Sequence, residues 1–212
     1  MECSMNKKKI VWYILVGVNV ALFVLLGVQY EKQRRLQESI AGKVLRFHVI
    51  ANSDEAYDQE LKLKVRDAVG ARMAELLLDA GSRAECEQII QRELDEIEHT
   101  AESVIKEEGY SYGTEIFLRE VQFPVKTYGD YTFPAGAYEA LEIIIGEGEG
   151  HNWWCVMYPN MCFSGSVYEV VDEDAKTALQ EVLSAEEYEE VLASGNYEVQ
   201  FKYLKFLNEL TE

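Results

Sequence analysis

The sequence predicts an α+β fold, in which a layer of helices packs on a mixed β-sheet behind one N-terminal transmembrane or signal helix. Three observations lead to this prediction. An apolar segment lies near the N-terminus, apolar residues recur every three or four positions over residues 57–104, and the period changes to two from residue 110 onwards. With 48% hydrophobic residues, the 212-residue chain can bury the core of one sizeable domain.

The apolar segment, residues 10–28, is long enough to cross a membrane. Its one clearly polar side chain is Asn19, whereas a buried core helix usually keeps a polar stripe. About 19–20 helical residues span the hydrocarbon core of a bilayer. Residues 1–9 then form a basic cytoplasmic N-terminus. No good cleavage site follows Gly27, so a cleaved signal peptide and an uncleaved anchor both stay open.

Charge is divided unevenly along the chain. The net charge of −18 comprises +5 over residues 1–46, with eight Lys or Arg against three Glu, and −23 over residues 47–212, with 12 against 35. An excess of acids this large repels phosphates, which excludes nucleic-acid binding. We expect a stalk over residues 29–42 and a translocated, extracytoplasmic α+β domain over residues 43–212, although the positive-inside rule favours this orientation only weakly.

In the first half of that domain, the sequence predicts one strand and two helices. Val44–Ala51 alternates apolar and polar residues as a strand does, and Asn52–Glu55 offers a helix N-cap. Helical spacing then runs from Tyr57 to about Asp79. A capping box at Ser82 begins a second helix, which ends at Gly109. We expect these helices to form an antiparallel pair.

The second half predicts four strands followed by helices. Pro124 and Pro134 mark loops, a capping box at Ser184–Glu187 begins a further helix, and residues 196–210 have no clear type. The remaining predicted elements are the strands Thr114–Val121, Ala137–Ile145, Asn152–Met157 and Met161–Val171, and the helix Asp172–Leu183.

Two groups of residues have alternative interpretations. Arg46 and His48 share one face of the first strand, which is either a half-exposed charged face with an Arg46–Asp67 pair or a polar contact surface. Gly146–Gly150 is either a flexible acidic hairpin loop or an exposed recognition loop, and its two glutamates exclude a phosphate cradle.

Cysteine and histidine positions raise two further alternatives. Cys155 and Cys162 lie opposite each other if a four-residue turn joins their strands, so they form either a disulfide bond or a pair of buried thiols. Cys155 with His48 or His151 would be the core of a thiol-dependent hydrolase, although a strand interior is a poor place for a reactive thiolate. The spacing of Cys and His does not fit zinc, and we expect no metal, no cofactor and no small-molecule substrate.

Several segments together resemble stage II sporulation protein R. They are VLRFHVIANSD at 44–54, LKLKVRD at 61–67, FPAGAYEAL at 133–141 and IGEGEGHNWWCVMYPNMCF at 145–163, and the resemblance covers roughly residues 40–205. It implies a secreted or membrane-tethered signal of endospore formation, exported across the forespore membrane into the intermembrane space. There the family activates the membrane-embedded aspartic peptidase of the mother cell that processes pro-sigma-E. The resemblance therefore implies a ligand rather than an enzyme.

The polar and glycine positions within these motifs are the predicted partner contacts. An exposed aromatic patch drawn from Tyr110, Tyr112, Tyr128, Tyr131 and Tyr138 would add to them, although core packing explains half of these equally well. A third alternative, beside the activating signal and the hydrolase, is a structural domain of the cell envelope that holds partners near the membrane. The predicted contacts are Arg46, His48, Asn52, Asp54, Gly146, Gly148, His151, Asn152, Trp153 and Trp154.

Overall fold

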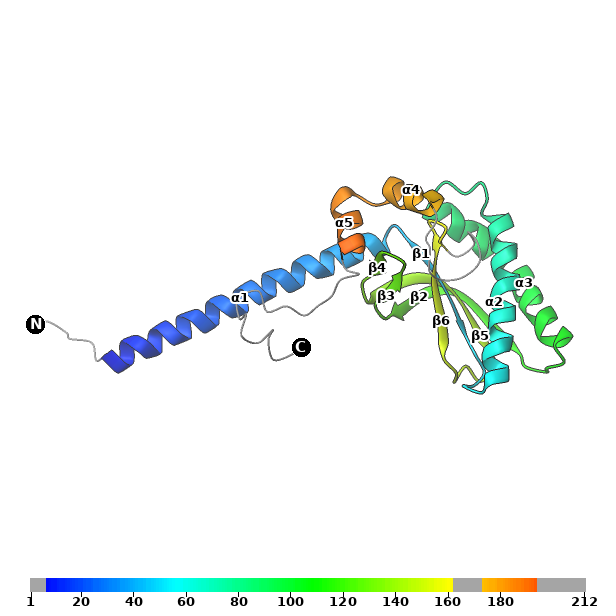
Figure 1. The fold of residues 1–212 in the computed structure, drawn as a ribbon, viewed down its shortest axis with the longest axis horizontal. Coiled ribbons are helices and arrows are strands. Elements are labelled where there is room, and N and C mark those ends of the chain that lie inside the picture. Colours follow the sequence, from blue (N-terminus) through cyan, green and yellow to red (C-terminus); the bar gives the residue numbers. More distant parts are fainter. Residues whose placement is uncertain (1–6, 162–172, 194–212) are drawn as a thin grey trace, which may run out of the picture.

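A computed structural model describes residues 7–161 and 173–193 (Figure 1). The first element, α1 (Lys7–Ala41), is a single helix of 35 residues. Its apolar part is exposed, and among the described residues it is the helix long and apolar enough to cross a membrane. This agrees with the predicted transmembrane or signal helix. The predicted stalk, residues 29–42, continues the same helix without a break as far as Ala41.

Four strands form the main sheet, in the order β2-β5-β1-β6. β1 and β5 are parallel, while β6 and β2 run antiparallel to their neighbours, so the sheet is mixed as predicted. The parallel pair is possible because the long segment between β1 and β5 provides a crossover. The strands are β1 (Leu45–Ile50), β2 (Thr114–Phe123), β5 (Gly136–Ile145) and β6 (Asn152–Tyr158).

The two predicted helices cover one face of this sheet. They are α2 (Ala56–Leu76) and α3 (Arg83–Glu107), and they contact each other as well as the sheet. The side chain of Ser82 accepts a hydrogen bond from the backbone N–H of Glu85, which confirms Ser82 as the N-cap, while the Glu85 carboxylate accepts the N–H of Gly81 and not that of Ser82 as a full capping box requires. Apolar side chains of α2 and α3 meet alternate residues of the strands in one buried cluster, which includes Phe47, Val65, Ile97, Leu141 and Ile143.

The other face of the sheet is covered too, which the sequence did not predict. A two-stranded sheet, β3 (Lys126–Tyr128) with β4 (Tyr131–Phe133), packs here together with the end of α1, α4 (Glu173–Val182) and α5 (Ala185–Ala193) (Figure 1). The predicted loop between Pro124 and Pro134 is therefore a hairpin. The predicted strand Met161–Val171 and residues 196–210 lie almost wholly or wholly outside the described residues.

α5 joins the stalk part of α1 to the domain. The buried carboxylate of Glu187 accepts hydrogen bonds from Ser39 of α1 and Lys43, both at 2.5 Å, and from the backbone N–H of Ser184 at 2.6 Å. Burial alone would raise the pKa of Glu187, but these hydrogen bonds outweigh it and lower the pKa to about 2. The stalk is thus attached to the domain through one charged side chain as well as through Ile40, which is fully buried.

We expect Glu187→Gln to weaken this attachment, because hydrogen bonds to a charged group are worth roughly 1.5–3 kcal/mol. The lowered pKa also means that the stabilisation is present above pH 4.5 and is lost as pH falls from 4.5 towards 2. Thermal unfolding of the full chain in detergent between pH 7 and pH 3 measures both effects. The difference in Tm between wild type and Glu187→Gln should shrink on acidification, and a constant difference would contradict the assignment. Glu186→Gln, in an exposed pair with Lys32, is the matched control.

Candidate functional site

Two loops that carry family-like motifs meet at the end of β1 that lies away from α1. One joins β1 to α2 and contains Asn52–Glu55, and the other is Gly146–His151, between β5 and β6. Since β1 lies between β5 and β6, the second loop crosses over the end of β1 and is not the hairpin loop that the sequence suggested. The six residues of β1 place this end of the sheet about 20 Å from the end of α1.

The crossing loop is bound to its neighbours by backbone hydrogen bonds. The N–H groups of Glu149 and Gly150 donate to the carbonyls of Asn52 and Ala51 at 3.2 and 2.9 Å. The N–H of Glu147 donates to the side-chain oxygen of Asn52 at 3.0 Å. These bonds fix the loop on the β1–α2 connection, so the idea of a freely flexible acidic loop is wrong.

Glycine is required in the crossing loop because of this close contact. Gly146 has φ +59°, and a Cβ there would lie 2.2 Å from the side-chain oxygen of Asn52. At Gly150 a Cβ would lie 2.2 Å from the backbone carbonyl oxygen of Ser53, which cannot move aside as a side chain can. The glycine-rich composition therefore reflects packing of two loops and not a ligand cradle.

A buried carboxylate supports the β1–α2 loop from below. Asp58 accepts hydrogen bonds from Asn52 at 2.8 Å and Ser53 at 2.6 Å, and Tyr112 also bonds to it. Burial would raise the pKa of Asp58, but these three hydrogen bonds outweigh it and the net shift is downward. The predicted N-cap is therefore used differently, since α2 begins after Glu55 without a side-chain cap.

Nearby, the side chains of Asp54 and His151 are exposed and bonded to each other. The Nδ1 atom of His151 contacts the carboxylate of Asp54, which also accepts the backbone N–H of His151 at 2.6 Å. The hydrogen bond from the ring lowers the pKa of Asp54. Below them, Lys62 donates to the carbonyl of His151 at 2.9 Å. The predicted contacts Asn52, Asp54, Gly146, Gly148 and His151 thus lie together.

Three tyrosines form a stack beside these loops. Tyr57, which is 51% exposed, stacks on Tyr110, and Tyr110 stacks on Tyr112, with ring centroids 6.4 and 5.4 Å apart. The N–H of Gly146 donates to the carbonyl of Gly113 at 2.9 Å, which joins this stack to the crossing loop. We call residues 52–60, 107–115 and 146–151 together the distal loop surface. Its three segments contain nine acids and no Lys or Arg.

Arg46 and His48 lie elsewhere, on the sheet face that the hairpin covers. Both are buried, and Arg46 is not paired with Asp67, so the half-exposed charged face was a wrong interpretation. Arg46 donates to the carbonyl of Cys155 at 2.9 Å and to the hydroxyl of Tyr128 at 3.0 Å. Its guanidinium is surrounded by four rings, 4.3–5.9 Å away, from Phe123, Tyr128, Phe133 and Tyr138.

His48 belongs to a second buried polar group on that face. Its Nε2 atom is 2.8 Å from the carboxylate of Glu142, which also binds Arg119 at the edge of the sheet. Burial lowers the pKa of His48, and the hydrogen bond to Glu142 opposes this shift without cancelling it. The ring of Trp154 lies 4.6 Å from that of His48. His48 is thus a packed core residue, and its contact with a partner stays a prediction.

The aromatic and cysteine predictions have mixed outcomes. Tyr131 and Tyr138 are buried, Tyr128 packs on Arg46, and only Tyr110 and Tyr112 of the expected patch join the distal loop surface. Trp153 packs edge-on against Phe47, while Asn152 is exposed. The sequence patterns did not single out Tyr57 of the tyrosine stack, or Arg119 and Glu142 of the buried polar group. Glu142 is the one acid within the apolar run Leu141–Ile145, and an acid in such a run indicates a buried carboxylate with polar partners.

The constellation proposed for a hydrolase is not assembled. Cys155 is disulfide-bonded, and the predicted partner Cys162 lies outside the described residues, so the pairing itself stays a prediction. Cys155 pairs with Phe47 across the strands, one residue from His48, and adjacent residues of a strand face opposite sides. Cys86 is a free thiol, and burial raises its pKa to about 11, the opposite of what a nucleophile needs. Among residues 7–161 and 173–193, no group of three His, Cys, Asp or Glu could hold a metal ion.

Comparison with known proteins identifies the family. The family model for stage II sporulation protein R matches residues 41–168, a range that includes all three segments of the distal loop surface. The chain belongs to the stage II sporulation protein R family. It is 32% identical to stage II sporulation protein R of Bacillus subtilis (strain 168) over 206 residues, covering 88% of this chain and 91% of the relative. No solved structure matches it. A sporulation role is thereby established, as the resemblance implied.

Proposed function

We propose that this protein is an extracytoplasmic signal of endospore formation, exported from the forespore, that activates the membrane-embedded aspartic peptidase processing pro-sigma-E in the mother cell. Membership of the stage II sporulation protein R family supports a sporulation role, and the exposed apolar helix α1 supports a location at or across a membrane. The activation would occur by protein–protein contact and not by catalysis on the peptidase.

The observation that carries this proposal is the preorganised distal loop surface. Backbone hydrogen bonds from Glu149 and Gly150, together with the buried carboxylate of Asp58, hold two distant loops in one arrangement before any partner binds. A surface already ordered loses little conformational entropy on association, which leaves more of the contact energy for affinity. Half-exposed Tyr57 supplies an aromatic anchor of the kind that dominates binding energy at interfaces.

The position of this surface also suits a signal that acts across a gap. The stalk part of α1 leads out of the predicted membrane segment, and the distal loop surface lies at the opposite end of β1 from α1 (Figure 1). Its excess of acids would attract a basic partner surface and raise the rate of association. The proposal holds for a released domain and for one still tethered by residues 10–28.

Reconstitution in a non-sporulating host tests the proposal. The cognate peptidase and pro-sigma-E are expressed with or without the full chain, and cleavage of pro-sigma-E is read on a blot. We expect cleavage only when the chain is present, and we expect Cys155→Ser to retain part of it. Complete loss with Cys155→Ser, in a chain shown to be folded, would instead support the hydrolase. No cleavage from correctly exported wild type would overturn the proposal.

Substitution of the tyrosine stack locates the contact. We expect Tyr57→Ala to raise roughly 10- to 30-fold the amount of chain needed for half-maximal cleavage, since an anchor side chain is worth about 2 kcal/mol. Leu78→Ala, two residues beyond the other end of α2 and 80% exposed, is the matched control and should behave as wild type. Equal behaviour of the two variants would mean that the distal loop surface is not the contact.

A further inference from the structure

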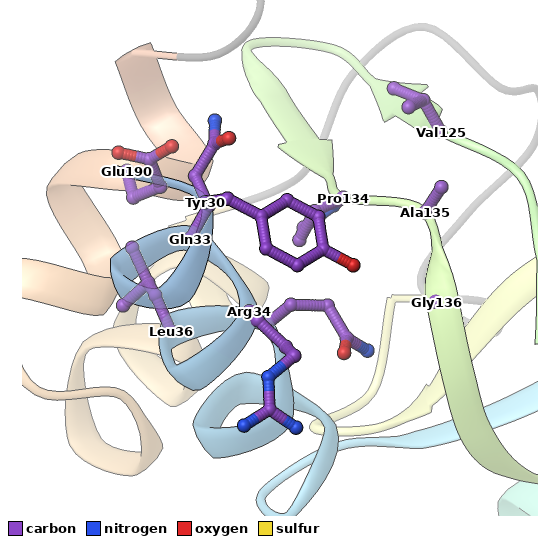
Figure 2. Close-up of a pocket in the computed structure, with 10 residues that line it drawn as sticks. Tyr30, Gln33, Arg34, Leu36, Val125, Pro134, Ala135, Gly136 and Glu190 are labelled. Atoms are coloured by element: carbon purple, nitrogen blue, oxygen red, sulfur yellow. The ribbon is translucent and has the colours of Figure 1, made fainter. Parts of the chain in front are cut away.

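A cleft lies between the stalk part of α1 and the corner that joins β4 to β5 (Figure 2). Its volume is about 410 Å³, within the range of sites that bury a ligand of moderate size. Tyr30 and Leu36 of α1 form one side, and Pro134 and Ala135 lie across from them, while Glu190 of α5 closes one end. The cleft is separate from the distal loop surface.

The walls of the cleft are fixed, but much of their apolar surface is uncovered. Gln37 of α1 donates a hydrogen bond to the carbonyl of Ala137 at 3.1 Å, which holds the two sides together. Tyr30 is nevertheless 69% exposed and Val125 is 51% exposed. Figure 2 shows the ring of Tyr30 lying beside Pro134, open to the cleft. An apolar occupant would therefore remove surface from water without needing to open the fold.

The described chain leads directly to this cleft. α5 ends at Ala193, only three residues after Glu190, and residues 194–212 follow. An extended chain spans about 3.4 Å per residue, so the eight residues from Ala193 to Phe201 can reach roughly 27 Å. Of the 19 residues from 194 to 212, eight are apolar or aromatic: Tyr197, Val199, Phe201, Tyr203, Leu204, Phe206, Leu207 and Leu210.

We propose that the C-terminal segment, residues 197–206, occupies this cleft of its own chain. Tyr197, Val199, Phe201 and Tyr203 alternate with Glu198, Gln200 and Lys202. In an extended chain this period of two places four apolar side chains on one side, toward the cleft, and the polar ones toward solvent. The docked segment would add a further contact between α1 and the β4–β5 corner, beside the hydrogen bond from Gln37 to Ala137.

Site-specific photo-crosslinking tests this docking in the full chain held in lipid nanodiscs. A benzophenone amino acid replaces Val125 or, separately, Ala135, and mass spectrometry locates the crosslinked peptide. We expect crosslinks to residues 197–206, and a mixture of light and ¹⁵N-labelled protein should show that they form within one chain. The same probe at Leu78, which is exposed and does not line the cleft, should give none of them.

A second variant removes the proposed contact without touching the cleft. With Phe201→Ser and Tyr203→Ser together, we expect the yield of the crosslink from position 125 to fall at least fivefold. Crosslinks to lipid, to a second copy, or only to residues 7–193 would overturn the proposal, as would an unchanged yield in the double variant. The readout needs no peptidase, so its outcome is independent of the proposed signalling function.

Discussion

Gly150→Ala should destabilise the domain by roughly 2–3 kcal/mol and lower Tm by roughly 5–10 °C. The new Cβ would lie 2.2 Å from the carbonyl oxygen of Ser53 and 2.9 Å from the Cβ of Ala51. Neither atom is the end of a flexible side chain, so the two loops must separate. The hydrogen bond from Gly150 to Ala51 should be weakened as they do.

Gly113→Ala is the matched control for this prediction. Gly113 belongs to the same distal loop surface, but a Cβ there meets nothing within 4 Å. We expect its stability to stay within about 0.5 kcal/mol of wild type. Thermal unfolding followed by tryptophan fluorescence suits the comparison, because Trp153 and Trp154 lie in β6 directly after the crossing loop.

The same two variants connect the packing of the loops to signalling. If the preorganised loops form the contact, Gly150→Ala should lose activation of pro-sigma-E cleavage at a temperature at which it is still folded, and Gly113→Ala should retain it. Wild-type stability in Gly150→Ala would contradict the close packing itself. Wild-type cleavage in a measurably destabilised Gly150→Ala would show that the arrangement of these loops does not matter for signalling.

Elements with a clear hydrophobic period were predictable from the sequence, within a few residues of their ends. The strand predicted at Val44–Ala51 is β1 (Leu45–Ile50), the N-cap at Ser82 begins α3, and the capping box at Ser184 begins α5. These features depend on neighbours within one or two turns, so local sequence determines them. The β3–β4 hairpin was missed because strands of three residues are too short to show a period.

Features that depend on distant pairing could not be predicted in this way. Nothing local to Gly146–Gly150 indicates that β1 lies between β5 and β6, and this order alone converts an apparent hairpin into a crossing loop. Tyr57, at the start of α2, likewise stacks on Tyr110, which follows the end of α3 and is 53 positions away in the sequence. The alternation in β1 correctly placed Arg46 and His48 on one face, but it could not show that a second layer covers that face.

Substitutions of Arg46 can show whether this side chain stabilises the core or contacts a partner. It is fully buried, and burial lowers its pKa. Within residues 7–161 and 173–193, its Nη1 atom has no hydrogen-bond partner and aromatic rings surround the charge. Arg46→Ala should cost roughly 3–5 kcal/mol, because it leaves a cavity among four rings. Arg46→Met fills much of that volume and removes a charge that is costly to bury, so we expect a loss of only about 1 kcal/mol.

Unfolding in urea and the pro-sigma-E cleavage assay then separate two roles for this side chain. If Arg46 acts by packing beneath Tyr128 and Phe123, Arg46→Met should remain folded and should activate cleavage nearly as well as wild type. If it instead reaches a partner, as the motif alone suggests, Arg46→Met should be folded but inactive. A loss of stability in Arg46→Met as large as in Arg46→Ala would show that the cation–ring and hydrogen-bond contacts outweigh the cost of burying the charge.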